Sequence, residues 1–465
     1  MRQLLAAEIR GSWVAWLSVL ATFVAANFAL GLSLLQYDLG RSYPWPDPWE
    51  EGPQILVIGG GFNLAASILT SLAVIGAAAG LVVSSRRGAL ARLALAGASP
   101  GQVLRTVLTQ LAVVSLAGAV IGDALAVALF HPYLVAEAAE REWATVPPAT
   151  WSLTSLLWSS ALCVVVAIVG GWRQARVGTR VPPVEALRQS QGAPQRRPGV
   201  GRWIATALLV GLVGFGVAAM KGLGESDNPG VRSSILQTAM LLLLLAGVTL
   251  ATAAPLSVAA ITRAWTSLIP GGVAWHLARR TVIAKADRLV KSVVPVMFAV
   301  GLLTGMVGIA ATLNATLAAS GSSTQLDHVS LFSTLNFVGL PLVIAVAGGL
   351  SALLMMGRQR DAELALAGIV GATPAQRILV PIMEAVIVSV TAFLLGIAMM
   401  GTGIASLLVA LAATPGAKVA VGIPWADLAI VMGATTVLTI AATTLPTLPA
   451  LRQPAPEVVA RLIAT

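Results

Sequence analysis

Two carboxyl groups inside strongly apolar stretches are the clearest candidates for chemistry in this sequence. Asp123 lies late in the apolar run 104–130, and Glu384 lies near the start of the run 377–411. Ionisable side chains at membrane depth usually face protein or water, and they mark substrate contacts, proton relays or structural pairs. For Asp123, a substrate contact and a structural tether both remain open. A proton relay is disfavoured, because one carboxylate per half of the chain, at unmatched depths, makes no continuous path.

The remaining chemistry-bearing residue types are scarce. The chain has three histidines and one cysteine, Cys163, which argues against a multi-ligand zinc or iron site and against a disulfide framework. No G-x-x-x-x-G-K-[ST] loop is present, so nucleotide phosphates would lack both the amide cradle and the lysine that such loops supply. We therefore expect no catalytic, cofactor-binding or metal-binding residues, and no ATP hydrolysis, in this chain itself.

The elements that must position Asp123 and Glu384 are transmembrane helices. Of the 465 residues, 57% are hydrophobic and only 10% are charged, whereas soluble domains typically have about 25% charged residues. A bilayer core needs about 20 apolar residues per helix. Ten continuously apolar runs meet this need, which predicts an all-α polytopic membrane protein: 12–35, 54–83, 104–130, 151–172, 203–220, 234–261, 290–314, 333–356, 377–411 and 425–447.

The distribution of charge predicts the orientation of these helices. Six alternate segments, which include both termini, hold 24 of the 29 lysines and arginines. Most acidic residues lie in the intervening loops. The positive-inside rule then places both termini in the cytosol, as an even number of spans requires. We therefore attribute the net charge of +10 to the basic cytosolic segments and their contact with anionic lipid. We expect no nucleic-acid partner.

An internal repeat relates the two ends of the chain. The segment 97–102, Gly-Ala-Ser-Pro-Gly-Gln, returns 274 positions later as 371–376, Gly-Ala-Thr-Pro-Ala-Gln. Both copies follow an even number of spans, so the repeat is parallel. We predict a first four-span unit over 1–188, a linker with a two-span insert over 189–262, and a second four-span unit over 263–465. Parallel repeats disfavour the inverted architecture of many secondary transporters.

Each repeated segment has the local signals of a bent helical connection. Gly97 suits the C-terminal cap of one helix, and Ser99 followed by Pro100 suits the start of the next. Thr373 and Pro374 repeat the start signal. We name these two connections the elbows. An elbow could bind lipid headgroups at the membrane surface, or it could dock a cytosolic partner, in which case the docking surface is presented twice.

The elbow sequences resemble the FtsX-like permease domain, the membrane component of MacB-type ABC transporters. The resemblance rests on Arg-x-x-Glu-(Leu/Ile)-Ala followed by Gly-Ala-(Ser/Thr), and it covers roughly 80–188 and 355–462. Ala89 stands where the first unit should have its glutamate. The residues that match or flank this motif are Arg86, Arg87, Leu90, Arg92, Gly97, Ala98, Ser99 and Pro100 in the first unit, and Arg360, Glu363, Leu364, Gly371, Ala372, Thr373 and Pro374 in the second.

The resemblance implies a permease driven by a separate cytosolic ATP-binding subunit, which would hold the ATP and magnesium. In the family the elbow is a coupling helix that is seated in the ATPase. Two elbows in one chain then imply two ATPase copies. The alanine- and arginine-rich, lysine-poor composition indicates a bacterium, so we expect the protein in a bacterial cytoplasmic membrane. The resemblance also places a carboxylate where Glu384 stands, which favours a structural role for that residue.

Three functions follow from these features. The leading hypothesis is the permease subunit of an ABC transporter that exports or extracts an amphipathic lipid, antibiotic or peptide. The first alternative is an FtsX-like protein that signals to extracellular cell-wall enzymes through an accessory extracellular protein. The second is an ATP-independent secondary transporter. The aromatic first loop, with Tyr37, Tyr43, Trp45 and Trp49, suits either an interfacial belt or a substrate mouth.

A basic amphipathic segment precedes the seventh span. Trp275, Ala278, Val282, Ala286 and Leu289 recur at helical spacing, with basic residues on the other faces. Such a helix usually lies in the membrane interface with its apolar side in the acyl boundary. We therefore expect this segment to be a bent connection in the membrane interface, separate from the two elbows, that anchors the span that follows.

Overall fold

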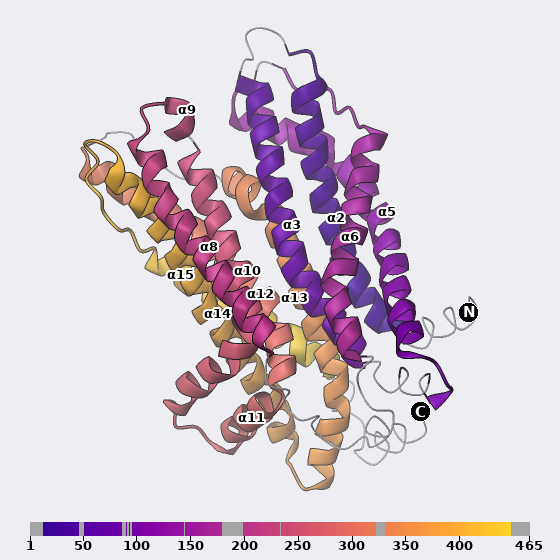
Figure 1. The fold of residues 1–465 in the computed structure, drawn as a ribbon. Helices are drawn as coiled ribbons and strands as arrows, with labels where there is room; N and C mark the ends of the chain where they lie inside the picture. Colours follow the sequence, from indigo (N-terminus) through magenta and orange to yellow (C-terminus); the bar gives the residue numbers. More distant parts are fainter. Residues whose placement is uncertain are drawn as a thin grey trace.

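A computed structural model of the chain describes residues 13–45, 51–85, 90, 93, 95–143, 145–178, 199–232, 234–321 and 331–447. Regular structure in these ranges is helical throughout (Figure 1). Ten of the helices are long and apolar enough to cross a membrane, so the ten predicted spans and the all-α class are confirmed. The protein is a multi-pass membrane protein.

The first unit is a bundle of four helices: α2 (Trp13–Ser42), α3 (Glu51–Ser85), α5 (Pro100–Glu140) and α6 (Leu153–Gly178). Its core is made of side chains that are almost inaccessible, among them Phe23, Leu111 and Phe130. Glycine allows α5 to approach α2 closely, because a Cβ at Gly122 would meet the backbone of α2 at 2.8 Å. Small residues at such contacts are the usual means of packing helices inside a membrane.

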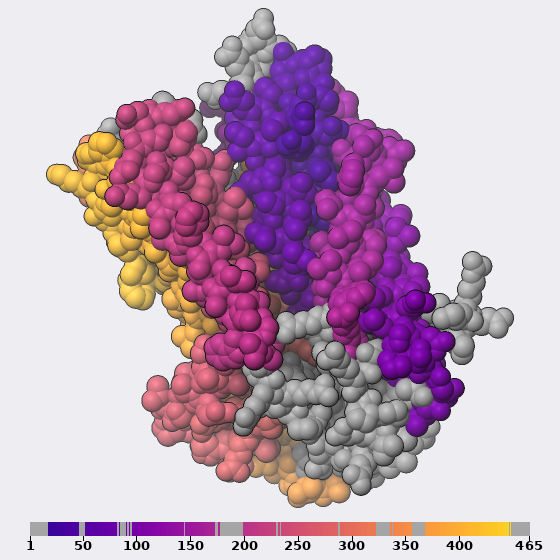
Figure 2. Space-filling model, viewed as in Figure 1, coloured from indigo at the N-terminus to yellow at the C-terminus, as the bar shows by residue number. Residues whose placement is uncertain are grey.

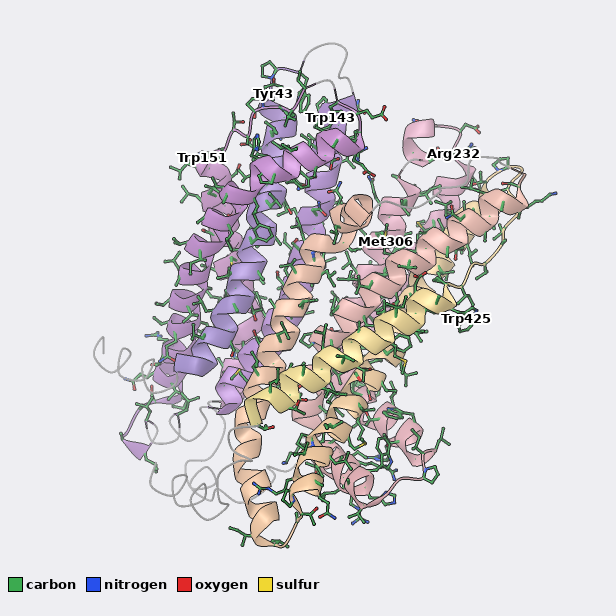
Figure 3. The ribbon with its side chains drawn as sticks, turned by 180° about the vertical axis from the view of Figure 1, so that it is seen from behind. Tyr43, Trp143, Trp151, Arg232, Met306 and Trp425 are labelled. Atoms are coloured by element: carbon green, nitrogen blue, oxygen red, sulfur yellow. The ribbon has the colours of Figure 1, made fainter. Side chains whose placement is uncertain are left out.

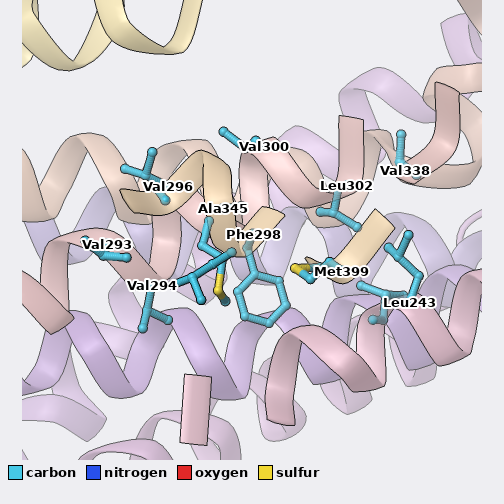
Figure 4. Close-up of a cluster of buried hydrophobic side chains, with 14 of the residues drawn as sticks. Leu243, Val293, Val294, Val296, Phe298, Val300, Leu302, Val338, Ala345 and Met399 are labelled. Carbon is cyan, nitrogen blue, oxygen red and sulfur yellow. The ribbon is translucent and has the colours of Figure 1, made fainter. Parts of the chain in front are cut away.

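The second unit repeats this order with α12 (Ala286–Ala319), α13 (Leu331–Ile369), α14 (Pro374–Ala413) and α15 (Trp425–Thr444), followed by the short 3₁₀ helix η2 (Leu445–Thr447). Its core surrounds Phe298, Met399 and Leu243 (Figure 4). Glycines also mark the contact between α12 and α14: a Cβ at Gly301 would meet the Met399 side chain at 2.5 Å, and one at Gly396 would meet the Val300 side chain at 2.7 Å.

The insert consists of α8 (Val200–Glu225), the single turn α9 (Pro229–Arg232) and α10 (Ile235–Ser267). Helix α10 packs against α14, α12 and α3, whereas α8 packs against α14 and α10. The outward face of α8 carries large exposed apolar residues, such as Leu208 and Phe215. These residues suit contact with lipid, which makes the insert an outer layer on one side of the second unit.

Helix α11 (Val273–Ala284) is the basic amphipathic segment that precedes the seventh span. Its apolar side faces protein, whereas the sequence predicted that it faces lipid. Trp275, Ala278 and Val282 are buried, and α11 packs on α14, α10 and α12. The ring of Trp275 meets Trp265 edge-on at 5.9 Å. The expectation that this face lies in the acyl boundary was therefore wrong, because neighbouring protein covers it. The helix forms part of a lobe at one end of the molecule, beside α14 (Figure 2).

The two units meet through their first two helices. Helix α13 packs across α2 and α3, and α12 also contacts α3. The units diverge toward the end of the bundle that carries Tyr43, Trp151, Arg232 and Trp425 (Figures 1 and 3). We call this the far end, and the opposite one, where α11 and both elbows lie, the elbow end. The contact between the units, which we call the seam, is thus closest toward the elbow end.

Candidate functional site

The two elbows begin their second helices with the same hydrogen-bonded cap. The Ser99 hydroxyl accepts from the Gln102 backbone N–H at 3.3 Å, and the Gln102 side chain accepts from the Ser99 N–H at 2.8 Å. Thr373 and Gln376 form the same pair at 3.2 and 3.0 Å. A proline follows each cap, at a position where no backbone N–H is needed. The reciprocal cap fixes the start of α5 and of α14.

A glycine with positive φ closes the preceding helix in each elbow. Gly97 has φ +91° and Gly371 has φ +102°. The Ala98 N–H donates to the Leu93 carbonyl at 3.0 Å, and the Gly371 N–H donates to the Gly368 carbonyl at 3.2 Å. These are bonds of the Schellman motif, which needs a left-handed residue at that place. Each elbow is therefore a defined bend between two capped helices.

Both elbows lie at the same end of the molecule (Figure 1). Each presents an aliphatic side chain at the tip, just before the glycine. Leu95 is 50% exposed, Ile369 is 55% exposed and Val370 is 88% exposed. Leu95 and Ile369 occupy equivalent positions in the repeat. These tip residues were not predicted from the sequence, although their position next to the capping glycine could have indicated them.

The other predicted elbow residues are distributed around the bends. Leu90 is buried, and Ala98 packs against the core of the first unit. Ala372 is half-buried, whereas Pro100 and Pro374 are exposed. Arg360, Glu363 and Leu364 lie within α13. The three arginines of the first elbow, Arg86, Arg87 and Arg92, lie outside the described residues, so their predicted role stays a prediction.

Asp123 connects three helices of the first unit. Its Oδ1 accepts hydrogen bonds from Asn27 Nδ2 of α2 and from Ser159 Oγ of α6, each at 2.7 Å. Its Oδ2 accepts from Ser160 Oγ, also at 2.7 Å. The side chain lies at the margin of the buried face of α5. These three bonds are the contacts that a structural tether between helices requires.

Glu384 and its repeat equivalent Gln110 occupy the same position in the two units. Glu384 is 6% exposed and Gln110 is 2% exposed. Both take part in polar interactions within the protein. A side chain that is this deeply buried and bonded within the protein suits the structural role predicted for Glu384. Among the described residues, no three His, Cys, Asp or Glu side chains gather as a metal site would require.

A polar cluster at the far end, which the sequence patterns did not indicate, links the two units. Glu137 of α5 is 1% exposed and pairs with Arg141, with Nε to Oε1 at 2.5 Å. Its Oε2 accepts from Tyr133 at 3.2 Å and from Asn336 Nδ2 of α13 at 3.1 Å. The single proton of the Tyr133 hydroxyl is shared between Glu137 Oε2 and Asn336 Oδ1, which lies 3.0 Å away. We call these four residues the far-end clasp, because they join α5 of one unit to α13 of the other.

The aromatic residues of the first loop pack on the protein. Tyr43 and Trp45 meet edge-on at 5.1 Å, and Trp45 meets Trp143 at 5.8 Å. All three pack against the core of the first unit. Tyr37 lies beneath the guanidinium of Arg41. Trp49 lies outside the described residues, and the choice between an interfacial belt and a substrate mouth stays open.

Comparison with protein families supports the relationship inferred from the elbows. The model of the FtsX-like permease C-terminal domain matches the chain twice, at residues 61–183 and 335–455. A search of the curated proteins finds no match. The two matched ranges cover more than half of the chain, and each contains one elbow and the helices that flank it. Members are membrane permease components of ABC-type systems and generally work with a cytosolic ATP-binding subunit. The chain belongs to the FtsX-like permease family, and it carries two FtsX-like units.

Proposed function

We propose that this chain is the permease subunit of an ABC transporter that exports or extracts an amphipathic substrate, such as a lipid, an antibiotic or a peptide. ATP hydrolysis takes place in a separate ATP-binding subunit. Both termini and both elbows face the cytosol, where the basic segments lie. The substrate is handled between the two units or at the outer leaflet.

The observation that carries this proposal is the pair of matching elbows at one end of the molecule. Each has a capped bend and an exposed aliphatic tip. Exposed apolar residues in an aqueous region often mark contacts with partner proteins. An ABC ATPase works as a dimer with two equivalent docking grooves, so two elbows suit two ATPase copies per permease chain. Because caps and a positive-φ glycine fix the geometry of each bend, approach of the ATPases would move the helices of each unit together.

The elbow glycines provide a direct test of coupling. Gly97→Val and Gly371→Val force a β-branched residue into left-handed backbone, at a cost of roughly 1–2 kcal/mol each. A Cβ at either position meets no atom within 4 Å, so the change acts on the bend and not on packing. We expect each variant to lower the ATP turnover that the permease stimulates in its ATPase, and the double variant to abolish this stimulation.

Matched controls exist at the far end. Gly321 and Gly416 also have positive φ, +77° and +80°, with open space where a Cβ would lie. Their valine variants carry the same backbone strain away from the elbows, and we expect them to retain stimulation. Full stimulation by the folded Gly97→Val/Gly371→Val variant would refute the proposed coupling. Native mass spectrometry of the complex should give two ATPase subunits per permease chain.

A further inference from the structure

Among the residues that the structure describes, several buried polar atoms without a hydrogen-bond partner gather on α2 and α3 of the first unit. They are the Gln36 amide nitrogen, the Asn63 amide oxygen and the hydroxyls of Ser67, Thr70 and Ser71. Each of these residues is at most 1% exposed. A hydrogen bond from Asn63 Nδ2 to Gln36 Oε1, at 3.3 Å, joins two of them. An unpaired buried polar group costs about 1–3 kcal/mol, so a group of five calls for an explanation.

Helical periodicity places three of these residues along the seam. Asn63, Ser67 and Thr70 precede Val74 by 11, 7 and 4 positions, a spacing that keeps them on one side of α3. Val74 itself lies against Gly348 of α13, where an added Cβ would overlap its side chain. The side of α3 that meets α13 at this crossing therefore continues toward the far end as a row of amide and hydroxyl groups.

Gln36 lies along the same seam on α2. Eighteen residues, five full turns, separate it from Ser18, so the two share one side of the helix. At the elbow end that side contacts α13, because Thr22 donates to Ser351 Oγ at 3.0 Å and Ser351 donates to the Ser18 carbonyl. We call Gln36, Asn63, Ser67 and Thr70 the polar row.

The equivalent positions of the second unit are apolar. With the shift of 274 that relates the repeats, Asn63, Ser67 and Thr70 correspond to Phe337, Pro341 and Ile344. Ile344 is fully buried. At these three positions the polar groups are thus confined to the first unit's side of the seam. A seam with one hydrogen-bonding side and one aliphatic side matches the two halves of an amphipathic molecule.

We propose that the polar row is a binding site for the uncharged, hydroxyl- or amide-bearing headgroup of a lipid-like amphipath. The row supplies both donors and acceptors but no charged side chain, which suits a sugar-like headgroup better than a phosphate or an ammonium group. The alkyl chain lies along the apolar side, over Pro341 and Ile344. The far-end clasp bounds the site at its outer end, so the units must part there for the ligand to enter.

This site rests on the proposed function, since it names the part of the substrate that the permease holds. The test uses the full chain alone in lipid nanodiscs, without ATPase, so its outcome is independent of coupling. The probe is dodecyl glucoside with a diazirine in its alkyl chain. The reference probe is the dodecyl methyl ether with the same diazirine, which lacks the sugar. Crosslinked residues are identified by mass spectrometry, and concentration dependence gives relative affinity.

We expect the glucoside to crosslink to α3 and α13 along the seam several-fold more than the ether does. Thr70→Val and Ser67→Ala should each weaken glucoside binding roughly 2- to 12-fold, the range for one hydrogen bond. The matched control is Thr304→Val, which alters a buried threonine whose hydroxyl bonds its own helix at Val300, 2.9 Å away. This control should leave binding unchanged.

Stability separates a binding role from a structural one. The Thr70 hydroxyl has no hydrogen bond to lose, so Thr70→Val should leave the thermal unfolding temperature unchanged or raise it while binding falls. Asn336→Leu, which removes the clasp partner on α13, should increase crosslinking along the seam. Equal crosslinking by both probes, or wild-type binding by the Ser67→Ala/Thr70→Val variant, would overturn the proposal. In that case the row would hold ordered water only.

Discussion

Replacing Asp123 by alanine distinguishes a structural tether from a substrate contact. The carboxylate accepts three hydrogen bonds of 2.7 Å, from Asn27 on α2 and from Ser159 and Ser160 on α6. It thereby holds α5 to both neighbours inside the first unit. If this tether is its role, the loss should appear in the free energy of unfolding and not in the response to substrate.

The size of the loss follows from these contacts. Interhelical hydrogen bonds measured in a membrane protein average about 0.6 kcal/mol and reach about 1.7, which gives about 2–5 kcal/mol for three. Two donors keep a second acceptor, because Ser159 also bonds the Leu156 carbonyl at 2.7 Å and Asn27 the Ala119 carbonyl at 2.8 Å. Removing an ionised group from an apolar setting also recovers some free energy. We therefore expect Asp123→Ala to destabilise the protein by about 1–3 kcal/mol, and Asp123→Asn by roughly half as much.

Two measurements check this expectation. Reversible unfolding in mixed micelles, followed by tryptophan fluorescence, gives the free energy of unfolding. ATP turnover of the complex with its ATPase, titrated with substrate, gives the half-saturating substrate concentration. The tether predicts lower stability with an unchanged half-saturating concentration, and a smaller loss for Ser160→Ala. Wild-type stability of Asp123→Ala together with a raised half-saturating concentration would refute the tether and support substrate contact.

Three further predictions concern the elbows, the clasp and the insert. Removing both elbow caps with Ser99→Ala and Thr373→Ala should cost about 1 kcal/mol of local stability each, seen as faster amide exchange in the first turns of α5 and α14. Glu137→Ala leaves the buried side of the far-end clasp without its acceptor and should lower the free energy of unfolding by about 2 kcal/mol, measured as for Asp123. Gly224→Val would push a side chain into the α14 backbone and should destabilise the protein by about 1–3 kcal/mol. The thermal unfolding temperature reports that loss, and Gly222→Val, which faces open space, should leave it unchanged.

The features that the sequence predicted well are those set by local interactions. A span depends on a run of about 20 apolar residues, so all ten could be recognised without knowledge of their packing. The elbow caps depend on residues within a few positions of each other, as Ser99 and Gln102 or Thr373 and Gln376 are. Such contacts are determined by backbone geometry, which the sequence specifies directly.

The features that could not be predicted depend on pairs that are distant in the chain. Asp123 accepts a hydrogen bond from Asn27, 96 residues away in the sequence, and Glu137 accepts one from Asn336, 199 residues away. An apolar helix face also does not reveal what covers it. For that reason the buried side of α11, with Trp275 and Val282, could not be assigned to protein in place of lipid. Both outcomes satisfy the same hydrophobic pattern.

The two units resemble each other most closely at the elbow end. Over the rest of their length their surroundings differ. The bends at Gly97 and Gly371 share their caps, their backbone conformation and their exposed tips. By contrast, α10 covers α12 and α14 in the second unit, while the exposed face of α5 in the first unit keeps large apolar residues such as Val120 and Leu129. Symmetrical elbows suit two identical ATPase subunits that close together. An asymmetrical seam suits one ligand, because a molecule with a polar and an apolar end has no two-fold symmetry of its own. Under the proposed coupling, the fusion of two units into one chain lets the two ATPase contacts stay equal while the two sides of the seam become chemically different.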